Sequence, residues 1–190
     1  MRIIVEVSAR HVHISQNDLE RLFGKKHTLT PLHPISQHGQ FAAVETLDIK
    51  HGGKIIKGLR IVGPPRQASQ VELAHTDARA LGLKVPVRLS GNHVRTPGIT
   101  LIGPKGRVRM NHGVLIPQRH IHASPGRAHL AGLKEGSIVT VLVQGKRPIT
   151  FHSVYVRVHP SYRWHMHVDT DEGNAVGIKR KAVGTLTNSI

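Results

Sequence analysis

The chain has 190 residues, a formal net charge of +16, no cysteine, and only 3% Phe, Trp and Tyr. This length suffices for one large domain or two small ones, and 38% hydrophobic residues can form only a lean core. The absence of cysteine excludes disulfide frameworks and thiolate metal sites, so any metal must bind His, Asp or Glu. The positive charge favours anionic partners, but it does not separate nucleic acid from phosphorylated small molecules.

The first predicted element is a strand that begins at the N-terminus with the sequence MRIIVEV. No apolar segment with a small-residue cleavage site precedes it, which argues against a secretory signal. No apolar run approaches the roughly 20 residues that a membrane-spanning helix needs. We therefore expect a cytoplasmic protein without a membrane partner.

A short motif follows this strand and recurs twice. The sequence RHVHIS at residues 10–15 reappears as RHIHAS at residues 119–124, and QVELA at residues 70–74 is a weaker copy. The weaker copy places Glu72 where the first copy has His13. Each copy continues into a short predicted helix, with serine as the N-cap of the first and last helices and glycine near each C-terminus.

Segments around the motifs have the character of short strands. They are residues 57–62, 85–89, 98–102, 114–117, 138–143 and 154–158. Residues 24–44 contain Pro31, Pro34 and Gly39 and are interpreted as a connecting loop or flap. Many short strands in repeated units predict a mainly β protein with two related β-barrels or barrel-like halves and short capping helices.

Each strong copy of the motif carries a His-x-His pair, His11 with His13 and His120 with His122. On a strand, residues i and i+2 point to the same face, so both imidazoles of a pair can reach one metal ion. A single pair of this kind is more often a polar strand face. Two copies in the same local sequence make a metal site the better interpretation.

Each pair still needs a third ligand. Glu72 is the natural candidate for the first pair because of its place in the repeat, and a solvated strand carboxylate is the alternative. His167 is the candidate for the second pair, with His165 as a competitor on the same strand face. Three protein ligands leave one position open, which is typical of catalytic zinc, although imidazole and carboxylate also suit iron, cobalt or nickel.

Several stretches, taken in order, resemble the phosphate propanoyltransferase family, the phosphotransacylases of the propanediol-utilisation type. They are VSARHVHIS at residues 7–15, VGPPRQASQVEL at 62–73, TDARALGL at 76–83, RHIH at 119–122 and MHVDTDEGNA at 166–175. The resemblance implies two β-barrel domains with a swapped N-terminal segment. Residues 1–9 and 118–190 would form the first barrel, and residues 10–23 and 45–117 the second.

The resemblance also implies an activity, the reversible transfer of a short acyl group, acetyl or propanoyl, from acyl-CoA to inorganic phosphate. It implies two zinc ions per chain and a homodimer. The residues that match family positions are His11, His13 and Glu72 for one zinc ion, His120, His122 and His167 for the other, Arg66 for phosphate, and Ser8, Arg60 and Asn174 for coenzyme A.

The chain departs from the family pattern at a few positions. Ala68 and Ser69 alter the arginine motif, Gly173 replaces an alanine, and His165 is not a family residue. The start of the chain, nine residues before Arg10, leaves no room for the amphipathic extension of family members housed in microcompartments. We therefore expect a free cytoplasmic enzyme, with the departures bearing on acyl preference more than on the reaction.

Two other functions fit part of the sequence. A metal-dependent hydrolase of acyl-CoA or of a phosphoester could use the same ligands and would act without phosphate. A basic RNA-binding β-barrel would explain the charge but not the His-x-His pairs, and the chain has few aromatic residues for base stacking, so no specific nucleic acid is expected. No cysteine and no serine with an adjacent base stands out as a nucleophile, so we expect direct transfer between two bound substrates.

Overall fold

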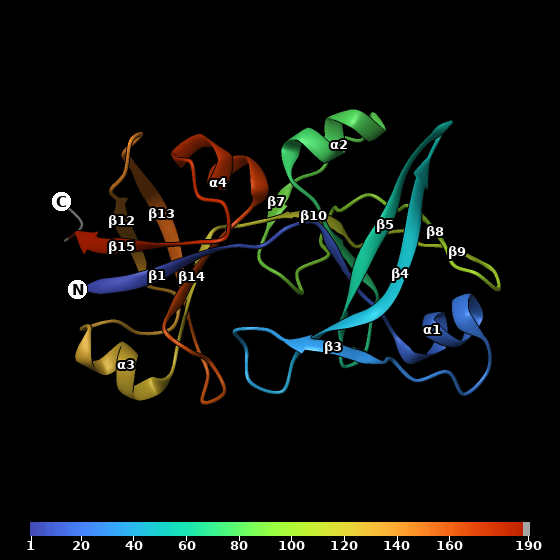
Figure 1. Ribbon diagram of the computed structural model, residues 1–190, viewed down its shortest axis with the longest axis horizontal. Coiled ribbons are helices and arrows are strands. Elements are labelled where there is room, and N and C mark those ends of the chain that lie inside the picture. Colours follow the sequence, from blue (N-terminus) through green and yellow to red (C-terminus); the bar gives the residue numbers. More distant parts are fainter. Residues whose placement is uncertain (188–190) are drawn as a thin grey trace. The chain divides into compact units, whose positions relative to one another are not determined.

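The computed structural model describes residues 1–187, and the chain divides into two compact units. One, here called the barrel unit, contains residues 1–9, residues 36–38 and the chain from residue 118 onward. The other, the sheet unit, contains residues 10–35 and 39–117. Both consist mainly of strands with few helices (Figure 1), so the predicted mainly β fold is confirmed.

The barrel unit is a closed barrel of six strands. In their order around the barrel they are β1 (Arg2–Val7), β14 (His165–Val168), β11 (His120–Ala123), β13 (Ile149–Val158), β12 (Ile138–Val143) and β15 (Lys181–Thr187). Strand β1 pairs in parallel with β14 and antiparallel with β15 (β1 is blue and β15 red in Figure 1). The N-terminal strand thus completes a barrel formed from the C-terminal part of the chain, as expected.

Alternation along these strands separates two kinds of side chain. Ile3 and Val5 of β1 share one buried apolar cluster with Met166 and Val168 of β14. The residues between them point to the opposite face of the barrel wall, because strand side chains alternate. The histidines of β14 therefore lie on the outer face of the barrel rather than in its core.

The sheet unit is a nine-stranded sheet that does not close, which agrees with the predicted barrel-like half. Its main path runs β7 (Val87–Arg88), β10 (Val114–Pro117), β6 (Gln70–Glu72), β2 (His11–His13), β5 (Lys54–Gly63), β4 (Phe41–His51), β8 (Thr100–Ile102) and β9 (Arg107–Arg109). The two end strands have only two and three residues and carry arginine. Short, charged edges resist further strand pairing, which is consistent with a sheet that stays open.

The segment over residues 24–44, expected as a connecting loop, contains strand β3 (Pro31–Pro34) and the start of β4. Strand β3 is the one strand of this sheet that lies off the main path. Strand β3 pairs antiparallel with β4, with Pro34 opposite Phe41, and all four of its residues are exposed. The two prolines hid this strand from the sequence pattern. Proline lacks a donor for a central ladder but is compatible with an edge strand, which β3 is.

Four short helices each follow a short strand. They are α1 (Gln16–Phe23) after β2, α2 (His75–Leu81) after β6, α3 (Pro125–Leu130) after β11 and α4 (Thr170–Val176) after β14. The predicted N-caps are confirmed, because the Ser15 and Ser124 hydroxyls accept from backbone N–H groups of α1 and α3. Asp169 caps α4 in the same way, so the strand–helix unit occurs four times rather than three. None of the helices in residues 1–187 has the length and apolar character needed to cross a membrane.

Candidate functional site

The first candidate metal site lies on two neighbouring strands of the sheet unit. Strands β2 and β6 pair antiparallel, with His11 opposite Glu72 and His13 opposite Gln70. His11 Nε2 lies 3.1 Å from His13 Nε2 and 3.5 Å from Glu72 Oε2, and His13 Nε2 lies 3.7 Å from Glu72 Oε1. The register therefore brings Glu72, the ligand suggested by the repeat, next to both histidines.

The burial of Glu72 and His13 favours the binding of a cation by this cluster. Glu72 is only 6% exposed, so it is not a solvated strand carboxylate. Burial, and then the charge of His11, lowers the pKa of His13 well below its usual value, against the opposite effect of Glu72. Near neutral pH the His13 ring is therefore neutral, which is the form that binds a metal ion.

The tautomer of His13 also suits metal binding. His13 Nδ1 lies 3.4 Å from the Val62 carbonyl oxygen, which can only accept a hydrogen bond. Nδ1 therefore carries the proton, and the lone pair of Nε2 faces His11 and Glu72. A backbone carbonyl that orients a ligating histidine in this way is common in metal sites.

The spacing of this cluster fits zinc. Zinc bonds imidazole nitrogen at about 2.0–2.1 Å in a tetrahedral arrangement, so two ligand atoms on one ion lie roughly 3.3 Å apart. The separations of 3.1, 3.5 and 3.7 Å bracket that spacing. Over residues 1–187, this is the one group of three His, Asp or Glu whose ligand atoms all lie within 4.8 Å of one another.

The second candidate site has the same plan in the barrel unit. Strands β11 and β14 pair antiparallel, with His120 opposite His167 and His122 opposite His165. The ring centroids of His120, His122 and His167 lie 4.6, 4.8 and 5.2 Å apart. In the described part of the chain, their ligand atoms do not converge as closely as those of the first trio.

Two of these histidines nevertheless have the chemistry of metal ligands. His120 Nδ1 lies 2.8 Å from the Gln118 carbonyl oxygen and so carries its proton, which leaves Nε2 available. His122 is 2% exposed, and neither of its ring nitrogens has a hydrogen-bond partner within residues 1–187. Burial, followed by the charges of His120 and His167, lowers the pKa of His122 far below its usual value. A buried nitrogen without a partner is costly, and a bound metal ion would satisfy it.

The geometry distinguishes the two candidates for the third ligand of this pair. The His167 ring lies 5.2 Å from His120 and 4.8 Å from His122. The His165 ring lies 6.5 Å from that of His167, and His122 stacks instead on Tyr162 at 3.9 Å. His167 is therefore the better placed of the two, and His165 lies at the edge of the cluster.

A capping network holds the second site together. Arg119, which precedes His120, pairs with Glu172 at 2.9 Å. Asp169 and Glu172 form a reciprocal capping box at the start of α4. Burial, and then the charge of Asp169, raises the pKa of Glu172, whereas Arg119 opposes the shift. The network thus ties the start of β11 to the end of β14, the two strands that carry the histidines.

Arg66 lies beside the first cluster. Its backbone N–H donates to the Ile14 carbonyl at 2.8 Å, which fixes it next to the end of β2. Its guanidinium donates to Ser90 Oγ and to Gln40 Oε1, both at 3.4 Å. The charge of Arg66 contributes to the lowered pKa of His13, so the guanidinium acts on the same space as the metal ligands. An anion held by Arg66 would lie close to a metal ion held by His13.

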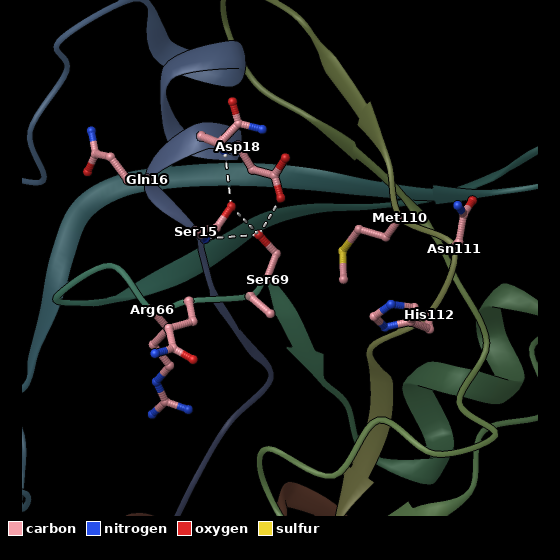
Figure 2. Close-up of a pocket in the computed structure, with 11 residues that line it drawn as sticks. Ser15, Gln16, Asp18, Arg66, Ser69, Met110, Asn111 and His112 are labelled. Carbon is pink, nitrogen blue, oxygen red and sulfur yellow. Dashed lines mark hydrogen bonds between the residues drawn. The ribbon is translucent and has the colours of Figure 1, made fainter.

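A cavity of about 570 Å³, with Arg66 among its lining residues, opens at the N-terminal end of α1 (Figure 2). Ser69 Oγ donates to Asp18 Oδ2 at 2.6 Å and accepts from the Ser15 N–H at 3.0 Å along one wall. In Figure 2 the Arg66 guanidinium points away from these three residues, so the phosphate interaction expected of Arg66 is not directed at this wall. Ser69, one of the departures from the family motif, therefore supports the start of α1.

Two of the residues assigned to coenzyme A by resemblance lie together in the barrel unit. Val7 packs against Gly173, where an added Cβ would come within 2.6 Å of Val7 Cγ2. Ser8 and Asn174 directly follow these two residues, so the contact brings them near each other. The contact with Val7 leaves no room for a side chain at position 173.

Arg60, the third residue assigned to coenzyme A, lies opposite His11 in the sheet unit. Its Nη1 donates to the carbonyl oxygens of Ala43 at 3.0 Å and Val44 at 2.7 Å. The backbone of β4 thus holds the guanidinium on the side of β5 that faces away from β2. A cation in this position would favour an anionic substrate.

Gln70, Ser90 and His93 were given no role from the sequence, yet they lie around Glu72. Gln70 donates to Glu72 Oε1 at 2.7 Å and to Ser90 Oγ at 2.9 Å, and it accepts from His93 at 3.0 Å. Gln70 stands two residues before Glu72, the spacing that relates the histidines of each pair. That spacing could have identified Gln70 as a neighbour of the site, whereas nothing local marks Ser90 or His93.

Known proteins are similar to this chain over most of its length. A profile of the family described as phosphate propanoyltransferase matches residues 4–179. The phosphate propanoyltransferase of Lachnoclostridium phytofermentans is 48% identical over 184 residues, which cover 96% of this chain and 85% of that protein. The proteins of the same name from Thermotoga maritima and Salmonella typhimurium are 47% and 44% identical, over 91% and 90% of this chain and 83% and 81% of their own lengths.

Proposed function

Because the chain belongs to the phosphate propanoyltransferase family, we propose that it converts short-chain acyl-CoA and inorganic phosphate reversibly to acyl phosphate and coenzyme A. Acetyl and propanoyl are the proposed acyl groups. The observation that carries the proposal is the buried cluster of His11, His13 and Glu72, with Arg66 beside it.

Two zinc ions per chain are part of the proposal. His11, His13 and Glu72 would hold the first ion, supported by their spacing and burial. The second would be held by His120, His122 and His167, supported by their packing. Three protein ligands on each ion leave a position for substrate.

The reaction places defined demands on the residues. A phosphate oxygen attacks the thioester carbonyl, a carbon–oxygen bond forms, and the carbon–sulfur bond to coenzyme A breaks. A zinc ion held by these residues would supply Lewis acidity to the oxygen on which charge develops. Arg66 presents a planar fork that matches two phosphate oxygens, and it would hold the nucleophile beside His13.

Positioning of coenzyme A would complete the site. Ser8, Arg60 and Asn174 are the proposed contacts to this substrate. Binding both substrates before reaction removes the entropic cost of a second encounter, which is a large part of the barrier for such a transfer. No covalent acyl-enzyme is needed, and transfer is direct.

A thiol-release assay tests the proposal. Purified protein is supplied with acetyl-CoA or propanoyl-CoA, with and without phosphate, before and after removal of metal. We expect release of coenzyme A that requires both phosphate and metal. Release without phosphate would identify a hydrolase of acyl-CoA, and no release from protein with bound zinc would contradict the proposed activity.

We also propose a cytoplasmic homodimer, because the family resemblance implies one. Light scattering after size-exclusion chromatography gives the molar mass in solution. A mass twice that of the 20.9 kDa chain is expected. A mass equal to that of one chain would overturn this part of the proposal.

A further inference from the structure

Gln70 occupies the fourth corner of the first metal cluster. It lies on β6 opposite His13, and it points to the same face as Glu72 because the two are separated by one residue. Its exposed fraction is 2%. In the barrel unit the corresponding corner, opposite His122, holds His165. The register therefore does not by itself require an amide at this position.

The partners of Gln70 allow one orientation of its amide. Nε2 lies 2.7 Å from Glu72 Oε1 and 2.9 Å from Ser90 Oγ, and Oε1 lies 2.7 Å from the Gly91 N–H and 3.0 Å from His93 Nε2. An ionised carboxylate can only accept and a backbone N–H can only donate, so the NH₂ group must face Glu72. Both donors and both lone pairs of the amide are then used, which is what a buried polar group requires.

This orientation determines how Glu72 presents its oxygens. Oε1 receives the Gln70 hydrogen bond and lies 3.7 Å from His13 Nε2, while Oε2 lies 3.5 Å from His11 Nε2. Rotation of the carboxylate about its last bond would break the bond from Gln70. The amide thus holds Glu72 toward both histidines and adds no charge of its own.

We propose that Gln70 is a positioning residue that sets the Glu72 carboxylate for the first metal ion and couples it to the phosphate-binding side of the site. The coupling runs through Ser90, whose hydroxyl oxygen accepts from Gln70 at 2.9 Å and from Arg66 at 3.4 Å. This inference rests on the proposed function of the His11, His13 and Glu72 cluster. Partners of this kind around a metal ligand affect metal affinity nearly as strongly as the ligand itself.

The experiment compares two variants of the full-length protein. Gln70→Met keeps the length of the side chain but removes all four hydrogen bonds. Thr96→Val is the matched control, because Thr96 is buried and holds the same loop through the His93 carbonyl at 2.7 Å and the Gly113 N–H at 2.8 Å, without touching Glu72. Zinc affinity is measured by competition with a chromophoric chelator, and ligand geometry by the visible spectrum of the cobalt-substituted protein.

Gln70→Met should weaken one of the two zinc equivalents about 10- to 100-fold and alter the cobalt spectrum. It should also raise the KM for phosphate. Thr96→Val should lower the melting temperature but leave the zinc affinity and the cobalt spectrum unchanged. Unchanged zinc affinity in Gln70→Met, or an equal loss in Thr96→Val, would overturn the positioning role.

A third variant covers the case in which Gln70→Met does not fold. Gln70→Asn keeps a buried amide but withdraws it from Glu72, so the zinc affinity should again fall, and unchanged affinity would overturn the inference. The wild-type protein distinguishes failure of the Gln70 inference from failure of the proposed function. Wild type that binds zinc and releases coenzyme A with phosphate, while the Gln70 variants match it, refutes the inference alone. Wild type that binds no zinc refutes both the metal site and the inference.

Discussion

The Nε2 atoms of His11 and His13 lie 3.1 Å apart, with the two rings at 90° to each other. Two ring nitrogens this close repel each other unless a proton or a metal ion lies between them. The Glu72 carboxylate next to both nitrogens stabilises a cation between them. A metal ion held by these three groups would therefore occupy the space between the two rings.

The stability of the metal-free protein should depend on pH in a defined direction. Burial lowers the pKa of His13 and of His122, so the folded state keeps both rings neutral at pH values where the unfolded chain protonates them. The unfolded state then binds more protons, and stability falls as the pH is lowered through about 6.5. Thermal unfolding of chelator-treated protein between pH 8 and pH 5 measures this, with the zinc-loaded protein as the control. A melting temperature of the metal-free protein that stays constant or rises toward pH 5 would contradict the assignment.

Arg66→Ala should impair the use of phosphate and leave the metal in place. Charge-assisted hydrogen bonds contribute about 1.5–3 kcal/mol each, so the KM for phosphate should rise about 10- to 100-fold. Arg66→Lys should recover only part of this loss, because lysine keeps the charge but not the planar fork. Steady-state kinetics with phosphate as the varied substrate give the KM, and elemental analysis gives the zinc content. Loss of zinc in Arg66→Ala would show that the arginine is structural.

Direct transfer predicts a particular kinetic pattern. Initial rates with acyl-CoA and phosphate varied together should give intersecting double-reciprocal lines, because both substrates must be bound before reaction. Intact-protein mass spectrometry after mixing with acyl-CoA alone should find no added acyl group. Parallel lines together with an isolable acyl-enzyme would demonstrate a double displacement instead.

Gly173→Ala should destabilise the fold despite the better helix propensity of alanine. The gain in propensity in α4 is about 1 kcal/mol, whereas overpacking against a buried neighbour costs about 1–3 kcal/mol. The added Cβ would lie 2.6 Å from Val7 Cγ2, and valine has little rotamer freedom with which to withdraw. Chemical denaturation should therefore show a lower free energy of unfolding.

The double variant supplies the control for this packing argument. In a Val7→Ala background the obstructing methyl group is gone, so Gly173→Ala should become neutral or stabilising. The coupling between the two positions would then be positive in a double-mutant cycle. Additive effects would show that the contact with Val7 is not the reason for glycine at position 173.

Some elements of the fold could be predicted from the sequence because they depend on local geometry. The serine N-caps of α1 and α3 follow from the two copies of the motif, and both accept the expected backbone hydrogen bonds. Strand β3 could not be predicted from the sequence, because its prolines give it the composition of a loop and only its pairing with β4 makes it a strand. The sequence left open whether each half closes into a barrel, since the pattern of short strands is the same in open and closed sheets.

The candidate site likewise has features that the sequence predicts and features that only the tertiary structure decides. The alternation of strand side chains determined from the sequence alone that His11 and His13 share a face, as do His120 and His122. The tertiary structure decided what stands opposite them, because strand register depends on hydrogen bonds between segments far apart in the chain. That register puts Glu72 against His11, favours His167 over His165, and gives Gln70 its single orientation. The residue types and their spacing along each strand are thus local properties of this sequence. The third ligand of each histidine pair, and the residues that hold it, were decided by pairing between strands.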